Sequence, residues 1–113
     1  MTDLATYIAD IKKYTSSVNE AAAAGIVRHL GIALRSRDSS LVAGKDPAEL
    51  ARIRDGFLKK KLALPDDDAK LDAAIHDVIE KLKADRTKSR VTVYYLLAEH
   101  YKKLDLFVKP AAA

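Results

Sequence analysis

Apolar residues recur every three or four positions in five segments of the chain, which is the spacing of amphipathic helices. Residues that cap or break helices separate these segments. No stretch shows the paired, alternating pattern typical of a hairpin. The sequence therefore predicts an all-α fold, a compact bundle of about five helices with no sheet. The expected helices cover residues 3–14, 20–36, 47–61, 65–82 and 88–104.

The third predicted helix has the clearest start signal. Asp46 occupies the N-cap position, Pro47 the first helical position and Glu49 the third, as in a capping box. Phe57 falls on the apolar face of this helix. We therefore expect Phe57 to lie in the core.

The second predicted helix contains Gly25 and Gly31, each of which costs about 1 kcal/mol relative to Ala. Close approach of a neighbouring helix would compensate for such a cost. Residues 36–46, which follow this helix, show no period. We expect them to form a loop from which Leu41 and Val42 point inward.

Apolar side chains cover most of the last predicted helix. Its broad apolar face consists of Val91, Tyr94, Tyr95, Leu97, Ala98, Tyr101 and Leu104. Leu96 lies on the remaining side, so the helix is apolar all round. Such a helix is either central in a bundle or half-buried in an interface. We take Val93, Leu96 and Leu97 as candidate interface residues for self-association.

The length of 113 residues suits one domain, which we expect to span residues 1–108, followed by a frayed tail at 109–113. The chain has no cysteine, which excludes a disulfide scaffold, a cysteine-based zinc site and a thiol nucleophile. No stretch approaches the roughly 20 apolar residues of a membrane span, and the first residues lack a signal-peptide pattern. We therefore expect a soluble, cytoplasmic protein that makes no membrane contact.

Charge is arranged in blocks, although the total is only +4. Residues 45–62 carry a net charge of +3, residues 65–85 of −4 and residues 86–109 of +4. In one interpretation the acidic block neutralises its basic neighbours. In the other, basic residues converge on a patch for an anionic partner. The candidate anion-binding residues are Lys59, Lys60, Lys61, Arg86, Lys88 and Arg90.

Two stretches of the sequence come near a metal-binding or a phosphate-binding pattern, and neither completes it. Asp72, His76 and Glu80 share one helix face, but this face lies opposite the apolar positions and points to solvent, whereas metal ligands need a protected pocket. Gly44-Lys45 is followed by Asp46 and follows no strand, so it fails the phosphate-loop pattern. The sequence predicts no catalytic residue, no metal site and no cofactor, and we expect a protein that is not an enzyme.

Arg54 lies at the edge of the apolar face of the third predicted helix. A guanidinium there needs a partner or must reach solvent. We expect it to pair with an Asp, with anion recognition as the alternative. Residues 35–40 offer the same choice, because Asp38 and its neighbouring serines can form local turn hydrogen bonds.

Residues 35–62 and 83–104 carry a family resemblance. The strings DSSLV, FLKKKL and RVTVYYLLAE within them resemble a family of small bacterial proteins known only as a domain of unknown function. The similarity covers nearly the whole chain. It implies a bacterial, soluble, all-helical protein, and it implies no activity, cofactor or site residue.

Two hypotheses about function follow. The first is a non-enzymatic protein-interaction module that self-associates or binds another protein, with the last helix as central strut and part of the interface. The second is a nucleic-acid-binding module, because the fourth and fifth helices have helix-turn-helix spacing. The acidic fourth helix and the apolar remainder of the fifth argue against the second hypothesis. Its recognition helix would begin with Arg86, Lys88, Ser89, Arg90 and Thr92.

Overall fold

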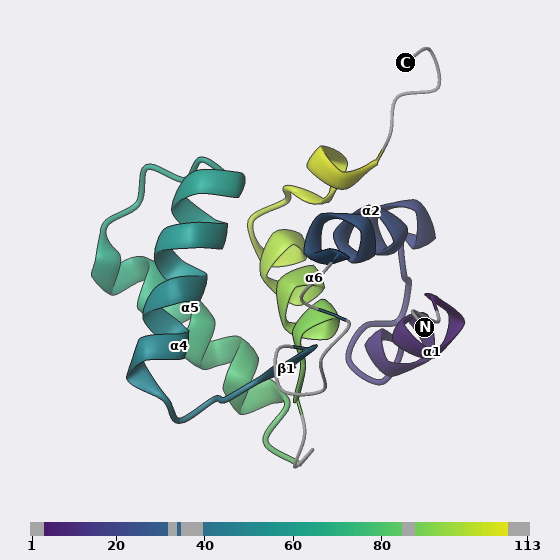
Figure 1. Ribbon diagram of the computed structural model, residues 1–113, viewed down its shortest axis with the longest axis horizontal. Coiled ribbons are helices and arrows are strands. Elements are labelled where there is room, and N and C mark those ends of the chain that lie inside the picture. Colours follow the sequence, from purple (N-terminus) through teal and green to yellow (C-terminus); the bar gives the residue numbers. More distant parts are fainter. Residues whose placement is uncertain (1–3, 32–33, 35–39, 85–87, 109–113) are drawn as a thin grey trace.

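The computed structural model describes residues 4–31, 34, 40–84 and 88–108. Within these residues the five predicted helical segments are confirmed, the third being split between two elements (Figure 1). The predicted tail at 109–113 lies outside the described residues. The elements are α1 (Leu4–Ile11), α2 (Glu20–Leu30), β1 (Leu41–Val42), α4 (Pro47–Arg52), the π-helix η2 (Ile53–Lys61), α5 (Asp68–Lys81), β2 (Lys88–Ser89), α6 (Arg90–His100) and the short 3-10 helix η3 (Leu104–Phe107).

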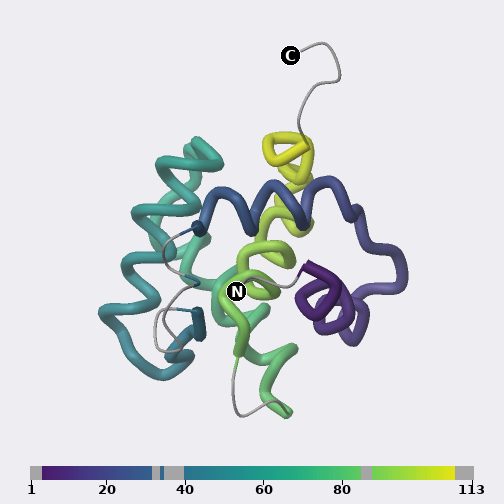
Figure 2. Tube along the Cα trace, turned by 45° about the vertical axis from the view of Figure 1, so that its right-hand side comes forward, coloured from purple at the N-terminus to yellow at the C-terminus, as the bar shows by residue number. Residues whose placement is uncertain are grey.

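Helix α6 runs through the middle of the molecule, with α1 and α2 on one side and α4, η2 and α5 on the other (Figures 1 and 2). All eight residues from Val91 to Ala98 are buried. The hydroxyl of the buried Tyr95 accepts a hydrogen bond of 2.8 Å from the backbone N–H of Asn19. The central position of α6 explains why its sequence is apolar on every side.

The prediction of no sheet is wrong in one place. Leu41 pairs with Ser89, and Val42 with Lys88, in an antiparallel two-stranded sheet. Each strand has only two residues, which is too short for an alternating pattern to reveal. The pair fastens the chain before α4 to the start of α6, and Val42 is buried as expected.

Helix α2 ends at Leu30, before the predicted end at residue 36. Gly31 follows with a φ of +40°, a left-handed conformation that glycine tolerates and that stops the helix. Gly25 serves a different purpose, because a Cβ at this position would lie 1.9 Å from the carbonyl oxygen of Phe107. The expected compensation by close approach is therefore found at Gly25, where α2 packs directly on η3.

The fifth predicted helix is shorter than expected at both ends. Its first two residues form β2, and α6 ends at His100. Lys102 then takes a φ of +58°, which breaks the helix before the chain turns into η3.

The start of the third predicted helix is confirmed in one respect and wrong in another. The side chain of Asp46 accepts a 3.0 Å hydrogen bond from the backbone N–H of Ala48, as an N-cap should. The capping box is not completed, because the N–H of Asp46 donates to the carbonyl oxygen of Ala43 at 3.0 Å. The carboxylate of Glu49 instead turns inward and pairs with Arg90.

Phe57 lies in the core as predicted, with 2 % of its surface exposed. It is carried by the nine-residue π-helix η2, and its ring stacks on that of Tyr94 at a centroid distance of 4.0 Å. The ring of Phe107 also stacks on that of Phe57, at a centroid distance of 5.9 Å. These three rings join η2, α6 and η3.

The helices are all modest in length. The longest described one, α5, has 14 residues, whereas a membrane span needs about 20 apolar residues. Among the residues that the structure describes, no helix combines the length and the apolar character needed to cross a bilayer.

Candidate functional site

Arg90, one of the candidate anion-binding residues, is turned into the protein. Its side chain is only 12 % exposed and forms an ion pair with Glu49. It also donates hydrogen bonds to the carbonyl oxygen of Leu41 at 3.2 Å and to the hydroxyl of Tyr94 at 3.3 Å. Arg90 therefore binds three parts of its own chain, and its guanidinium is not presented to an external phosphate.

The three lysines of the predicted basic run point to separate neighbours. Lys59 pairs with Asp68 and lies 3.7 Å from a carboxylate oxygen of Asp55. Lys61 lies over the ring of Phe107, with its Nζ 5.4 Å from the ring centroid. Lys60 is exposed. Lys88 lines a hollow between the turn after β1, the end of α5 and β2, and none of these three lysines lines it. The structure therefore does not bring the basic run together with Lys88.

Arg86, the remaining candidate, lies outside the described residues. The same holds for residues 35–39, so the alternatives offered for that segment cannot be read from the fold. Thr92, named as part of a recognition helix, is fully buried and donates a hydrogen bond to Asp10.

The three candidate interface residues are core residues of the single chain. Val93 and Leu97 are fully buried, and Leu96 is 3 % exposed. They offer no surface to a second copy while the chain is folded as described. The central position of α6 accounts for the apolar excess that suggested an interface.

Arg54 pairs with aspartates, as expected. Its guanidinium lies 2.9 Å from Asp55, 3.3 Å from Asp72 and 3.8 Å from Asp68. The hydrogen bond with Asp55 is the main reason that the pKa of Arg54 is raised, and the same bond lowers the pKa of Asp55. This network joins η2 to α5.

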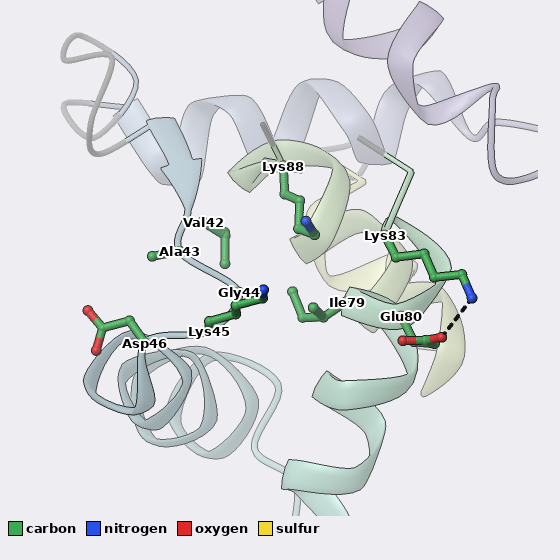
Figure 3. A pocket seen from close by; sticks show the side chains of 9 residues that line it. All are labelled: Val42, Ala43, Gly44, Lys45, Asp46, Ile79, Glu80, Lys83 and Lys88. Atoms are coloured by element: carbon green, nitrogen blue, oxygen red, sulfur yellow. Dashed lines mark hydrogen bonds and ion pairs between the residues drawn. The ribbon is translucent and has the colours of Figure 1, made fainter. Parts of the chain in front are cut away.

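A hollow of about 760 Å³ opens between the turn after β1, the end of α5 and β2 (Figure 3). This volume lies in the range of ligand-binding pockets, about 300–1,000 Å³. Apolar atoms provide most of its surface, and lysines surround it. The lining residues are Val42, Ala43, Gly44, Lys45, Asp46, Ile79, Glu80, Lys83 and Lys88.

Local sequence explains how the hollow is built. The register of the strand pair places Lys88 opposite Val42. The turn that follows is closed by the hydrogen bond from Asp46 to Ala43, which ends the strand and starts α4. The hollow is thus a direct product of the two-stranded sheet.

Gly44 lets this turn lie directly on α5. A Cβ at Gly44 would lie 3.0 Å from Cγ2 of Ile79 and 3.5 Å from Cδ of Lys88. Any larger residue would therefore intrude between the turn and the helix. The glycine keeps the middle of the hollow open.

The charged residues of the hollow differ in direction. Glu80 and Lys83 form an ion pair of 3.0 Å with each other, and Figure 3 shows this pair directed away from the hollow. The carboxylate of Asp46 also points away, since it caps α4. Lys88 extends from β2 toward Ile79 (Figure 3). Positive charge therefore dominates the inner side of the rim.

A second, smaller hollow of about 410 Å³ lies where α2, α4, η2 and α6 meet, and Glu49, Arg90 and Tyr94 form part of its wall. Burial raises the pKa of Tyr94. Burial, and then the charge of Lys61, lower the pKa of His29 at its edge. Because Glu49 and Arg90 already satisfy each other, this hollow holds a structural ion pair rather than a charge aimed at a ligand.

Sequence reasoning missed most of the lysine-rimmed hollow. It named Lys88 but not Lys45 or Lys83, and it considered Gly44-Lys45 only as a failed phosphate loop. The signal in the sequence was a short glycine turn next to two apolar residues in a loop without period. Its meaning depends on β2, which lies more than forty residues away.

In the described residues no group of three or more His, Cys, Asp or Glu is placed to hold a metal ion. A comparison with curated proteins finds no match. A family model described as "Protein of unknown function (DUF2853)" matches residues 6–105. This match confirms the resemblance carried by the strings in residues 35–62 and 83–104, and it covers α2 to α6 completely and α1 and η3 in part. The chain therefore belongs to the DUF2853 family, a family of proteins of unknown function.

Proposed function

We propose that the protein is a small, non-enzymatic interaction module that docks part of another protein at the lysine-rimmed hollow. The observation that carries the proposal is the hollow itself, an apolar floor at Val42 and Ile79 with lysines around it. Protein interfaces combine such an apolar centre with a polar rim. A bacterial, cytoplasmic setting is part of the proposal, supported by the resemblance and by the lack of cysteine.

Self-association remains a proposal, but it needs a different surface from the one first considered. Val93, Leu96 and Leu97 are inside the fold, and among the described residues the one large hydrophobic side chain that is exposed is Leu106. A single exposed leucine is ordinary for a monomer. The hollow is therefore the better-supported contact surface.

The nucleic-acid hypothesis relied on three cations, Arg86, Lys88 and Arg90. Arg90 cannot serve in this way while it is paired with Glu49. A continuous phosphate backbone would also leave the apolar floor at Val42 and Ile79 uncovered. We keep this alternative only as an outcome of the tests below.

The proposal can be tested by affinity capture with three forms of the full chain as bait. These are the wild type, Lys45→Glu in the turn of the hollow, and Lys70→Glu. Lys70 is an exposed lysine at the other end of α5, so this control makes the same charge change away from the hollow. We expect a partner held by the wild type and by Lys70→Glu but lost by Lys45→Glu, with cross-links from the partner to Lys45.

The same partner on all three baits, or material released by nuclease, would overturn the proposal. Light scattering after gel filtration, at low and high salt and with and without a DNA fragment, separates the alternatives. A dimer that persists in Lys45→Glu would show self-association through another surface. A stable DNA complex at physiological salt would support the nucleic-acid hypothesis instead.

A further inference from the structure

We propose that the hollow receives a short acidic segment of the partner protein, with an apolar side chain placed on the floor and carboxylates beside the lysines. This inference rests on the proposed function and names the chemistry of its ligand. It follows from three features of the hollow: its apolar floor, the position of its charges and its limited size.

The floor consists of side chains from two elements. Val42 of β1 is 5 % exposed and Ile79 of α5 is partly buried, and both belong to the edge of the hydrophobic core. Gly44 lies between them and adds no side chain. An apolar side chain of a ligand would therefore cover apolar surface that is already fixed in place, which favours binding by removing that surface from water.

The lysines stand on separate elements around this floor. Lys45 belongs to the turn before α4, and Lys88 to β2. The two acids of the rim are engaged elsewhere, Asp46 as the cap of α4 and Glu80 with Lys83. A carboxylate beside the exposed Lys45, next to an apolar side chain on the floor, would match this pattern, and charge complementarity of this kind governs specificity and association rate.

The hollow suits a peptide better than the other common anions. A nucleic acid offers a continuous row of phosphates and no apolar side chain to cover the floor at Val42 and Ile79. A lipid surface is bound by clusters of exposed basic residues, whereas here the positive charge surrounds a recess. A recess of about 760 Å³ holds a few side chains, which is the size of a short peptide contact.

The test measures binding of a fluorescently labelled peptide of alternating glutamate and leucine to the full chain. A peptide of alternating glutamine and leucine, equal in length, is the neutral control. We expect the acidic peptide to bind more tightly and to lose affinity as salt rises, because exposed charges are screened. In NMR spectra of the labelled protein, the backbone amides of Ala43 and Gly44 should shift on addition of the acidic peptide.

Three variants locate the site. Lys45→Glu should weaken binding of the acidic peptide about fivefold or more, while Lys70→Glu should leave it nearly unchanged. Gly44→Ala, which adds a methyl group to the middle of the hollow without changing charge, should weaken both peptides. Circular dichroism and thermal melting establish that each variant is folded. Because Lys45 lies on an exposed turn, its substitution tests the charge without depending on β2.

Each outcome has a distinct meaning. Equal binding of the acidic and neutral peptides, with loss in Gly44→Ala, would overturn the acidic ligand and leave docking at the hollow intact. Peptide binding that none of the hollow variants changes would overturn both the inference and the proposed function. Tighter binding of duplex DNA or of vesicles of anionic lipid than of the acidic peptide would likewise overturn the inference.

Discussion

At the scale of single residues, the ion pair between Arg90 and Glu49 is part of a contact that joins three elements of the fold. The carboxylate of Glu49 is 7 % exposed and the guanidinium of Arg90 is 12 % exposed. Arg90 also binds the carbonyl oxygen of Leu41, so one side chain joins β1, α4 and α6. A charge in such a place is stable only while its partner is present.

Removal of Glu49 should therefore destabilise the protein strongly. We expect Glu49→Ala to cost about 3–5 kcal/mol in the free energy of unfolding, because it removes the carboxylate that balances the charge of the nearly buried Arg90. Urea unfolding measures the change, and Asp77→Ala, at an exposed position on α5, should stay within about 0.5 kcal/mol. The double variant Glu49→Ala with Arg90→Met should recover part of the loss. A cost below about 1 kcal/mol for Glu49→Ala alone would mean that Arg90 finds solvent easily.

His29 should make stability depend on pH. Burial and the nearby charge of Lys61 lower its pKa below the ordinary value of 6.5. The folded state therefore favours the neutral ring, so this contribution to stability is complete above about pH 6.5 and declines as the pH falls toward the lowered pKa. His29→Gln should flatten this part of the stability profile between about pH 7 and pH 5. An NMR titration that places the pKa of His29 above 6.5 in the folded protein would contradict the prediction.

At the scale of elements, α6 shows how one helix can be apolar on every side because the rest of the same chain surrounds it. Its N-terminal end is tied to β1, its middle is covered by α2 and α5, and Tyr95 reaches the start of α2. Because helices of the same chain cover α6 on opposite sides, little of its apolar surface is left for a second chain.

A charge at Leu96 should accordingly prevent folding and not merely dissociate a dimer. Leu96 is 3 % exposed, so we expect Leu96→Glu to lose its cooperative melting transition, because an unpaired carboxylate would be buried. Leu96→Ala should remain folded and cost about 2–5 kcal/mol. Leu106→Ala, at a side chain that is 49 % exposed, is the matched control and should change stability little. A folded, monomeric Leu96→Glu protein would instead place Leu96 at an interface between copies.

At the scale of the whole molecule, the packing of α2 on η3 brings together residues from the first and the last third of the chain. Gly25 of α2 meets the backbone of Phe107, and the ring of His29 lies 5.9 Å from that of Phe107. These contacts link residues that are 82 and 78 positions apart in the sequence. They close the fold at the end of the molecule away from β1 (Figure 1).

The two glycines at positions 25 and 56 provide a matched test of this closure. Gly25→Ala should destabilise the protein by about 1–3 kcal/mol, because the new Cβ would overlap the carbonyl oxygen of Phe107. Gly56→Ala meets no atom within 4 Å and should be neutral or stabilising by up to about 1 kcal/mol. Thermal melting of both variants measures the difference. Equal effects at the two positions would mean that α2 does not approach η3 so closely.

The existence of the helices and the N-cap of α4 could be predicted because their signals are local. Asp46 and the next three residues indicate the start of α4. The core position of Phe57 follows from the helical spacing of the apolar residues around it. The strand pair could not be predicted, since two residues make no pattern and the partner of Val42 is Lys88. The local pattern likewise predicted that Glu49 caps α4. In the structure Glu49 pairs with Arg90, which is distant in the sequence.

The hollow could not be predicted because its lining residues come from segments that are distant in the sequence. Lys45 and Gly44 look like an ordinary turn, and Ile79 like an ordinary helix position. Only the pairing of β1 with β2 brings them beside Lys88. The sequence could identify the blocks of charge, but which cations meet depends on contacts between distant segments.

The central place of α6 also sets the order in which the protein can fold. A chain is synthesised from its N-terminus, so α1 and α2 leave the ribosome long before residues 91–98, against which they pack. Until then their apolar faces have no core to cover them, and the contacts that complete the fold span most of the sequence. Such contacts slow folding and expose a nascent chain to aggregation. The last third of this chain therefore decides when the first third becomes stable.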